Sequence, residues 1–195
     1  MKELGLYLFK YRSYIPIPFV IVMLIFMKPT LSSIIIGLMI ALTGELIRIW
    51  AVSYAGSETR TTSGVGGTFL ITQGPYSIIR NPLYAGNILI YTGLGIMSMS
   101  LFPYLQIFAL FFFIFQYHCI ILNEEEYLGT KFPLEFSQYI KSTGRYLPSA
   151  KTVPEGIKSK VDFKLKTGLE SEKRSLQAIV IVSSIIILFY IFIIK

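Results

Sequence analysis

Five apolar stretches, most of them close to the length of a membrane span, dominate this sequence. They cover residues 14–27, 31–50, 84–99, 103–122 and 176–194. An α-helix rises about 1.5 Å per residue, so about 20 residues cross a hydrocarbon core about 30 Å thick. A soluble domain does not need 53% apolar residues, only 15% charged residues and a mean hydropathy of +0.62. The sequence therefore predicts an all-α, polytopic membrane helix bundle with about five transmembrane helices.

The first apolar stretch, residues 14–27, is short and begins with Pro16 and Pro18. Basic residues precede it, which is also the arrangement of a secretory signal peptide. No small-residue cleavage site follows it, and the second stretch starts almost at once. We therefore expect the first two spans to form a membrane hairpin.

The net charge of +7 is concentrated in three regions: the N-terminal tail, the segment between the second and third spans, and residues 131–174. With five spans, all three regions fall on one side of the membrane, and the other side keeps Lys28 and Lys195. Cytoplasmic loops of membrane proteins are enriched in Lys and Arg. The pattern predicts a multi-pass integral membrane protein with a cytoplasmic N-terminus. It also favours anionic lipids over nucleic acid as the partner of the basic residues.

We predict one membrane core over residues 1–148, a basic polar linker over 149–175 and a C-terminal transmembrane helix over 176–195. Two insertions would face the cytoplasm. Residues 52–83 are rich in glycine and predict a loop with turns. Residues 123–148 mix aromatic and charged residues at helical spacing, which predicts a surface helix.

Glu45 and Arg48 lie three residues apart near the end of the second span, so they share one helix face. Charged residues at membrane depth are costly and need a reason. One reason is an ion pair that anchors the span at the interface. The other is that Arg48 also binds an anionic group of a ligand, and the sequence leaves both open.

A motif rich in turn-forming residues precedes the third span. Gly74 and Pro75 predict a turn, and Pro82 disfavours helix at Asn81, so a helix is expected to begin near Pro82. A helix N-terminus presents free backbone N–H groups and a positive partial charge. With Arg80 beside it, this end predicts either a carboxylate or phosphate site or a plain interfacial anchor.

Acidic residues end the fourth span. His118 and Glu125 share a helix face, whereas Glu124 points elsewhere. Carboxylates are unfavourable at the negative end of a helix, and a bound cation would remove the conflict. Alternatively, they are a solvated acidic run. The single cysteine, Cys119, excludes an internal disulfide and a multi-cysteine metal site, and we expect no metal centre.

Aromatic residues alternate with charged residues after these glutamates, and Arg145 follows them. This pattern predicts either an amphipathic helix over the site, with Arg145 turned toward it, or an anchor on the membrane surface.

Taken together, these motifs resemble the integral membrane methyltransferases of the isoprenylcysteine carboxyl methyltransferase family, which are related to the phospholipid methyltransferases. The resemblance covers roughly residues 37–148, in the family's order. The residues that carry it are Gly74-Pro75-Tyr76, Arg80-Asn81-Pro82-Leu83-Tyr84, Glu124-Glu125 with Leu128, then Phe132, Phe136 and Tyr139, and Arg145 with Pro148.

Three positions depart from the family pattern. Asn81 stands where the family has histidine, Pro133 where it has glycine and Phe136 where it has tyrosine. Asparagine donates and accepts hydrogen bonds but does not titrate near neutral pH. An acid-base role for this position is therefore in doubt.

The resemblance implies a pocket for S-adenosylmethionine on the cytoplasmic face, closed by the segment after the fourth span. Arg80 and the following helix start suit the cofactor's carboxylate, and Glu124 or Glu125 suits its ammonium and ribose hydroxyl groups. The cofactor-binding residues implied are Tyr76, Arg80, Asn81, Pro82, Tyr84, His118, Glu124 and Glu125. The catalytic residues implied are Arg80, Glu125 and Arg145.

The resemblance also implies methyl transfer to a lipophilic or lipid-linked acceptor at the cytoplasmic membrane face. A carboxylate acceptor, such as that of an isoprenylcysteine-like group, needs arginines to orient it. A lipid amine needs a carboxylate such as Glu125 to take a proton. The expected partners are a lipophilic or lipid-modified substrate and membrane lipids, with no nucleic acid and no obligate protein partner.

Two other functions are compatible with such an architecture. One is a membrane reductase like the steroid reductases, with a nicotinamide cofactor, and the other is a non-catalytic membrane scaffold. The arginine-proline-tyrosine and paired-glutamate motifs favour methyl transfer over reduction. The polar residues gather at one rim instead of crossing the spans, which disfavours a transport path.

Overall fold

The structure is a computed structural model that describes residues 2–56, 69–149 and 151–194. Regular structure in these residues is helical throughout, with no β-strand, which confirms the predicted all-α membrane bundle. The helices are α1 (Lys2–Tyr11), α2 (Pro16–Ile25), α3 (Leu31–Ala55), α4 (Pro82–Ser98), α5 (Tyr104–Lys131), α6 (Pro133–Ser142) and α7 (Leu165–Phe189), with short helical turns η2 (Gly74–Ser77), η3 (Glu155–Ile157) and η4 (Tyr190–Ile194). Gly64, Gly66 and Gly67 of the predicted glycine-rich insertion lie outside the described residues.

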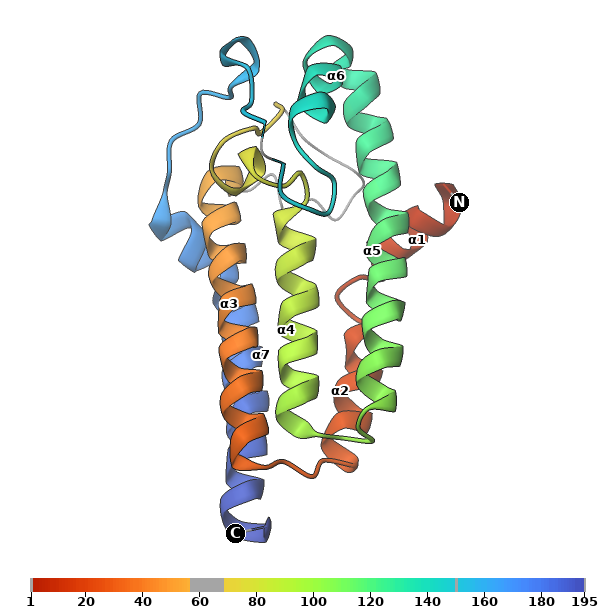
Figure 1. The fold of residues 1–195 in the computed structure, drawn as a ribbon, viewed down its shortest axis with the longest axis vertical. Helices are drawn as coiled ribbons and strands as arrows, with labels where there is room; N and C mark the ends of the chain where they lie inside the picture. Colours follow the sequence, from red (N-terminus) through yellow and green to blue (C-terminus); the bar gives the residue numbers. More distant parts are fainter. Residues whose placement is uncertain (1, 57–68, 150, 195) are drawn as a thin grey trace.

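Figure 1 shows α3, α4, α5 and α7 running along the long axis of the molecule. Helix α6 and the segments that lead into α4 and α7 gather at one end, where α4 and α7 begin and α3 and α5 end. We call this the loop end. Helix α1 packs beside α5, and α2 continues from it toward the opposite end of the bundle.

Three described helices, α3, α5 and α7, are long and apolar enough to cross a membrane. Helices α1 and α2 are bent by 56° at the residues between them and could form a fourth span as a pair. This is fewer than the five spans that the sequence predicts. Helix α4 has only 17 residues, about 25 Å at the usual rise, and the predicted first span yields only the ten residues of α2.

Helices α3 and α4 approach closely because small residues line their contact. A Cβ added to Gly93 would lie 2.5 Å from the amide nitrogen of Ala41 and 2.6 Å from the carbonyl oxygen of Gly37. A Cβ on Gly44 would lie 2.6 Å from the carbonyl oxygen of Gly86. Small residues allow this approach in membrane bundles, where close packing drives helix association. The start of α4 is thereby fixed beside the end of α3.

The segment after the fourth predicted span differs from the prediction of one helix over 123–148. Helix α5 continues without a break to Lys131, and α6 begins at Pro133. Phe132 between them has φ −128° and ψ 60°, outside the helical region. Proline disfavours a helical conformation in the residue before it, which explains the break.

The predicted linker over 149–175 is also more structured than expected. Thr72 Oγ1 donates to the carbonyl oxygen of Ile157 at 2.9 Å, and the backbone N–H of Lys164 donates to the carbonyl oxygen of Ser53 at 2.9 Å. Helix α7 begins at Leu165, well before residue 176. Its first turns are polar, so the sequence did not predict them as part of an apolar span. In the structure, Ser171 and Glu172 of these turns are nevertheless buried.

Candidate active site

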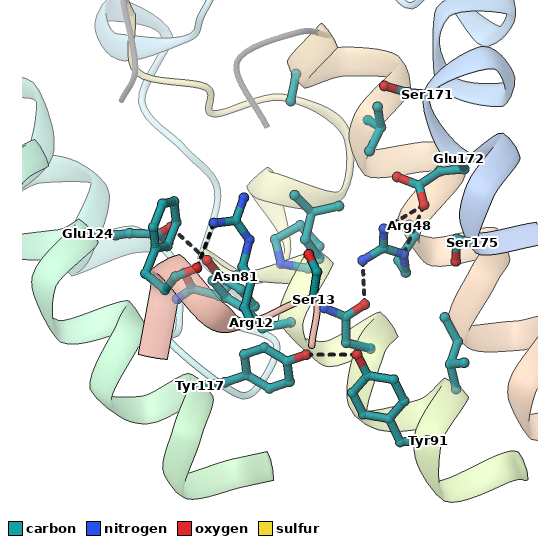
Figure 2. A pocket seen from close by; sticks show the side chains of 18 of the residues that line it. Arg12, Ser13, Arg48, Asn81, Tyr91, Tyr117, Glu124, Ser171, Glu172 and Ser175 are labelled. Carbon is teal, nitrogen blue, oxygen red and sulfur yellow. Dashed lines mark hydrogen bonds and ion pairs between the residues drawn. The ribbon is translucent and has the colours of Figure 1, made fainter. Parts of the chain in front are cut away.

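A cavity of about 970 Å³ opens inside the loop end of the bundle (Figure 2). This volume is at the upper end of the range of about 300–1,000 Å³ that is usual for small-molecule sites. Residues from α1 to α7 and from the segment 69–82 line it. The cavity contains most of the residues that the sequence singles out.

Glu125 of α5 is paired with two arginines. Its Oε1 accepts from Arg80 Nε at 2.9 Å, and its Oε2 accepts from Arg145 at 2.9 Å and 2.6 Å. The side chains of Arg80 and Glu125 are only 7% and 9% exposed. Arg80 also donates to the carbonyl oxygen of Thr143, which ties the segment after α6 to the start of α4. Because α5 continues to Lys131, Glu125 lies more than one turn before the helix end, where the predicted conflict with the helix dipole is weak, and two guanidinium groups pair with its charge.

Glu124, one residue earlier, faces a different set of partners. Its Oε1 accepts from the hydroxyl group of Tyr84 at 2.6 Å, and the charge of Arg12 acts on it. The ring of Tyr84 stacks on that of Tyr117, with 4.8 Å between centroids. The Tyr117 hydroxyl lies 3.3 Å from that of Tyr91. Glu124 thus presents a carboxylate to a cavity wall made of aromatic rings.

The start of α4 lies against the same cavity. Pro82 is its first residue, as predicted, and the side chain of Asn81 donates to the carbonyl oxygen of Arg145 at 3.3 Å instead of capping the helix. Tyr76 lines the cavity, and its carbonyl oxygen accepts from the Tyr139 hydroxyl at 2.6 Å. Burial raises the pKa of both Tyr76 and Tyr139 above the ordinary value. Both phenols are therefore neutral near physiological pH.

Two of the residues implied by the family resemblance lie outside the lining of the cavity. His118 Nδ1 is hydrogen-bonded to the hydroxyl group of Tyr146, on the side of α5 where Arg145 meets Glu125. Arg145 does not line the cavity but pairs with Glu125, which does. The others, Tyr76, Arg80, Asn81, Pro82, Tyr84, Glu124 and Glu125, all line the cavity.

A second charged cluster lies on the α7 side of the cavity. The predicted pair of Glu45 and Arg48 is present at 3.7 Å, but Arg48 binds Glu172 of α7 more closely, with Nε at 3.1 Å and Nη2 at 2.5 Å from Oε2. Arg48 also donates to Asn87 Oδ1, and Ser175 donates to Glu45 at 2.8 Å. Sequence reasoning missed Glu172, although an arginine at membrane depth signals that a partner is needed.

The residues of α1 and the α1–α2 connection were also missed. Arg12 and Ser13 line the cavity opposite α7 (Figure 2). The Arg12 guanidinium lies over the ring of Phe9, 3.9 Å from its centroid. Among the described residues, no group of three or more His, Cys, Asp or Glu side chains is placed to hold a metal ion.

Comparisons with known proteins identify two relatives of this chain and one protein family. The chain is 34% identical over 113 residues to the cobalt-zinc-cadmium resistance protein CzcN of Cupriavidus metallidurans, which is 58% of this chain and 46% of CzcN. It is 37% identical over 101 residues to the nickel-cobalt-cadmium resistance protein NccN of Alcaligenes xylosoxydans xylosoxydans, 52% of this chain and 43% of NccN. The aligned region thus covers less than half of either relative, and no solved structure matches.

The phospholipid methyltransferase family matches residues 32–134, more than half of the chain. The matched region contains α3, α4 and α5, and with them Arg80, Tyr84, Glu124 and Glu125. It confirms the resemblance to the isoprenylcysteine carboxyl methyltransferase-like membrane enzymes. This integral membrane chain therefore belongs to the phospholipid methyltransferase family.

Proposed function

We propose that the chain is an S-adenosylmethionine-dependent methyltransferase that modifies a lipophilic or lipid-linked acceptor. The observation that carries this proposal is the position of Glu124, Tyr84 and Arg80 around the open start of α4, in one cavity that extends into the apolar part of the bundle. These groups match the chemistry of the cofactor. The family match supports methyl transfer as the reaction.

The residues present fit S-adenosylmethionine group by group. Its ammonium or ribose hydroxyl groups suit the Glu124 carboxylate, which lines the cavity and accepts a hydrogen bond from Tyr84. Its carboxylate suits the N-terminus of α4 beside Arg80. Its positive sulfonium group suits the aromatic faces of Tyr84 and Tyr117, because cations are attracted to such faces.

When bound, S-adenosylmethionine supplies an electrophilic methyl group, and the bonding electrons stay on sulfur as the acceptor's lone pair forms the new bond. The chain's own contribution is to align the acceptor at about 3–3.5 Å and to exclude water. A carboxylate acceptor requires no base. An amine acceptor must lose a proton, and Glu124 is better placed than Glu125 to accept it, because both oxygens of Glu125 already bind arginines.

The acceptor would enter from the bilayer between α2 and α7. Ile17 and Ile21 of α2 and Ile179 and Val182 of α7 line the cavity on that side. The loop end carries most of the basic residues, so we place it, and the site, on the cytoplasmic face.

Calorimetric binding of S-adenosylmethionine to the detergent-purified chain tests the proposal. Glu124→Gln keeps the hydrogen bond to Tyr84 but removes the charge. We expect it to weaken binding by about 10-fold or more, the equivalent of one charge-assisted hydrogen bond. Glu126→Gln is the matched control, since Glu126 is exposed and paired with Lys2. A folded wild-type chain that does not bind the cofactor in detergent or in lipid nanodiscs refutes the proposal.

A further inference from the structure

The cavity has a polar half and an apolar half. The polar half contains Glu124, Arg80 and the start of α4. The apolar half is lined by aliphatic residues of three helices: Ile17, Ile21, Ile90, Leu94, Ile179 and Val182. On α7, Val182 lies ten residues beyond Glu172, or about 15 Å along the helix. The apolar half is therefore long enough for part of a lipid chain, and the polar end of such a molecule would lie near Glu172.

Arg48 and Glu172 stand where the two halves meet. Figure 2 shows them with Ser175 on one side of the cavity and Glu124 on the other. Their side chains are 17% and 5% exposed, and both line the cavity. Arg48 is fixed by Glu172 and by Asn87, and Asn87 lines the same cavity as Tyr117, whose ring stacks on that of Tyr84. The pair therefore faces the same cavity as the aromatic residues of the polar half.

Stability alone does not explain a buried ion pair between α3 and α7. Taking two charges out of water opposes their attraction, and well-packed apolar residues are often as stable as a buried ion pair. Charged groups at membrane depth commonly mark ligand sites.

Helix α7 lies outside the region that matches the family, residues 32–134, whereas Arg80, Tyr84 and Glu124 lie within it. The two sides of the cavity are therefore built by different parts of the chain. We infer that Glu172 of α7, together with Arg48, is an acceptor-positioning pair that holds the polar end of the lipophilic acceptor. This inference rests on the proposed methyltransferase function and assigns acceptor selection to α7.

A charge-swap variant tests this role in the full chain. Arg48→Glu with Glu172→Arg keeps an ion pair between α3 and α7 but reverses the charges presented to the acceptor. Glu172→Gln removes one charge, and Lys173→Gln is the control, since Lys173 is exposed on the same helix turn. Each variant is assayed for thermal unfolding, for S-adenosylmethionine affinity and for kcat and KM of methyl transfer. The acceptor probes are mixed phosphatidylethanolamine and phosphatidylglycerol vesicles and an S-prenylated N-acetylcysteine.

We expect the swap to fold but to unfold at a lower temperature than the wild type, because a carboxylate at position 48 lies beside Glu45. It should bind S-adenosylmethionine within about twofold of wild type, while its acceptor KM rises by about 10-fold or more. Glu172→Gln should raise KM in the same direction, and Lys173→Gln should leave it unchanged. A folded charge-swap variant with the wild-type acceptor KM would show that the pair only joins α3 to α7, and this result overturns the inference. An equal loss of cofactor affinity also overturns it, because the pair would then serve the methyl donor.

Failure of the proposed function gives a different result. In that case the wild type does not bind S-adenosylmethionine at all. A wild type that binds the cofactor but methylates neither probe overturns this inference alone, since a lipophilic acceptor of one of these two kinds is its premise.

Discussion

Glu125 offers the sharpest test of the charge network in this fold. Glutamates 124, 125 and 126 are adjacent in the sequence, yet each has a different environment: a cavity wall, two arginines, and solvent beside Lys2. Glu125→Gln preserves shape and one acceptor oxygen but removes the charge that Arg80 and Arg145 share. A folded protein with this substitution keeps two guanidinium groups that face each other without a carboxylate between them.

The cost follows from the burial of the two pairs. Breaking a buried ion pair by removing one partner costs about 3–5 kcal/mol. The pair with Arg80 is of this kind, with side chains 7% and 9% exposed. The pair with Arg145 adds little, because the Arg145 side chain is 34% exposed and water solvates it. We therefore expect a loss of about 3 kcal/mol in the free energy of unfolding.

Thermal unfolding of the purified chain in one detergent measures this effect. For a chain of this length, about 1 kcal/mol shifts Tm by about 2–4 °C, so Glu125→Gln should lower Tm by about 6–12 °C. The control is Glu126→Gln, whose pair with Lys2 has side chains 55% and 68% exposed. It should change Tm by less than about 2 °C, because exposed pairs contribute little.

The reasoning is refuted if Glu125→Gln and Glu126→Gln unfold within about 2 °C of each other. A double variant refines the test. Replacing Arg80 by Gln in the Glu125→Gln background removes one of the unpaired charges. It should therefore cost less than the sum of the two single changes, because the two residues share one interaction.

Three further predictions concern packing, hydrogen bonding and capping. Gly93→Ala should lower the free energy of unfolding by at least about 1–3 kcal/mol, because its Cβ would meet backbone atoms of α3. The control Gly95→Ala should be tolerated, because its Cβ would meet only a side-chain carbon at 3.6 Å. Thermal unfolding compares the two variants. Tyr139→Phe should cost about 1–2 kcal/mol by leaving the Tyr76 carbonyl without its donor. Burial raises the pKa of the Tyr76 and Tyr139 phenols, so the folded state binds these protons more tightly than the unfolded state. The free energy of unfolding should therefore hold below about pH 10 and fall above it. In a pH series of unfolding curves, Tyr139→Phe should show a shallower fall than the wild type. Thr30→Ala removes the side chain that caps α3 and should cost about 1 kcal/mol by the same assay.

Features that depend on nearby residues were predictable from the sequence. The start of α4 at Pro82 follows from the local preferences of proline, and the helical class follows from the apolar stretches. The family motifs brought Arg80, Tyr84 and Glu124 to one cavity, because their spacing is fixed by α4 and α5. These signals act over a few residues or along one helix.

The features that the sequence missed depend on distant contacts. Glu172 sits in a stretch that is polar in every local window, and this stretch is buried through contacts with α3, among them the pairing of Glu172 with Arg48, 124 residues away. The break before Pro133 was available in the sequence, since the residue before proline avoids the helical region. The predicted helix over 123–148 ran across it because the aromatic and charged pattern continued on both sides.

The composition of the cavity wall has a consequence for how such chains diverge. The matched region supplies α3, α4 and α5, but the cavity is closed on one side by Arg12 and Ser13 and on the other by Ser171, Glu172 and Ser175. Residues within the matched region must keep their mutual geometry, because Arg80 pairs with Glu125 and Tyr84 donates to the adjacent Glu124. The residues of α7 pair with Arg48 and Glu45 of α3, so a change in α7 alters the wall without dismantling the network of α4 and α5. Under the proposed function, the methyl-donor side is thereby constrained while the acceptor side is free to differ between relatives of different length.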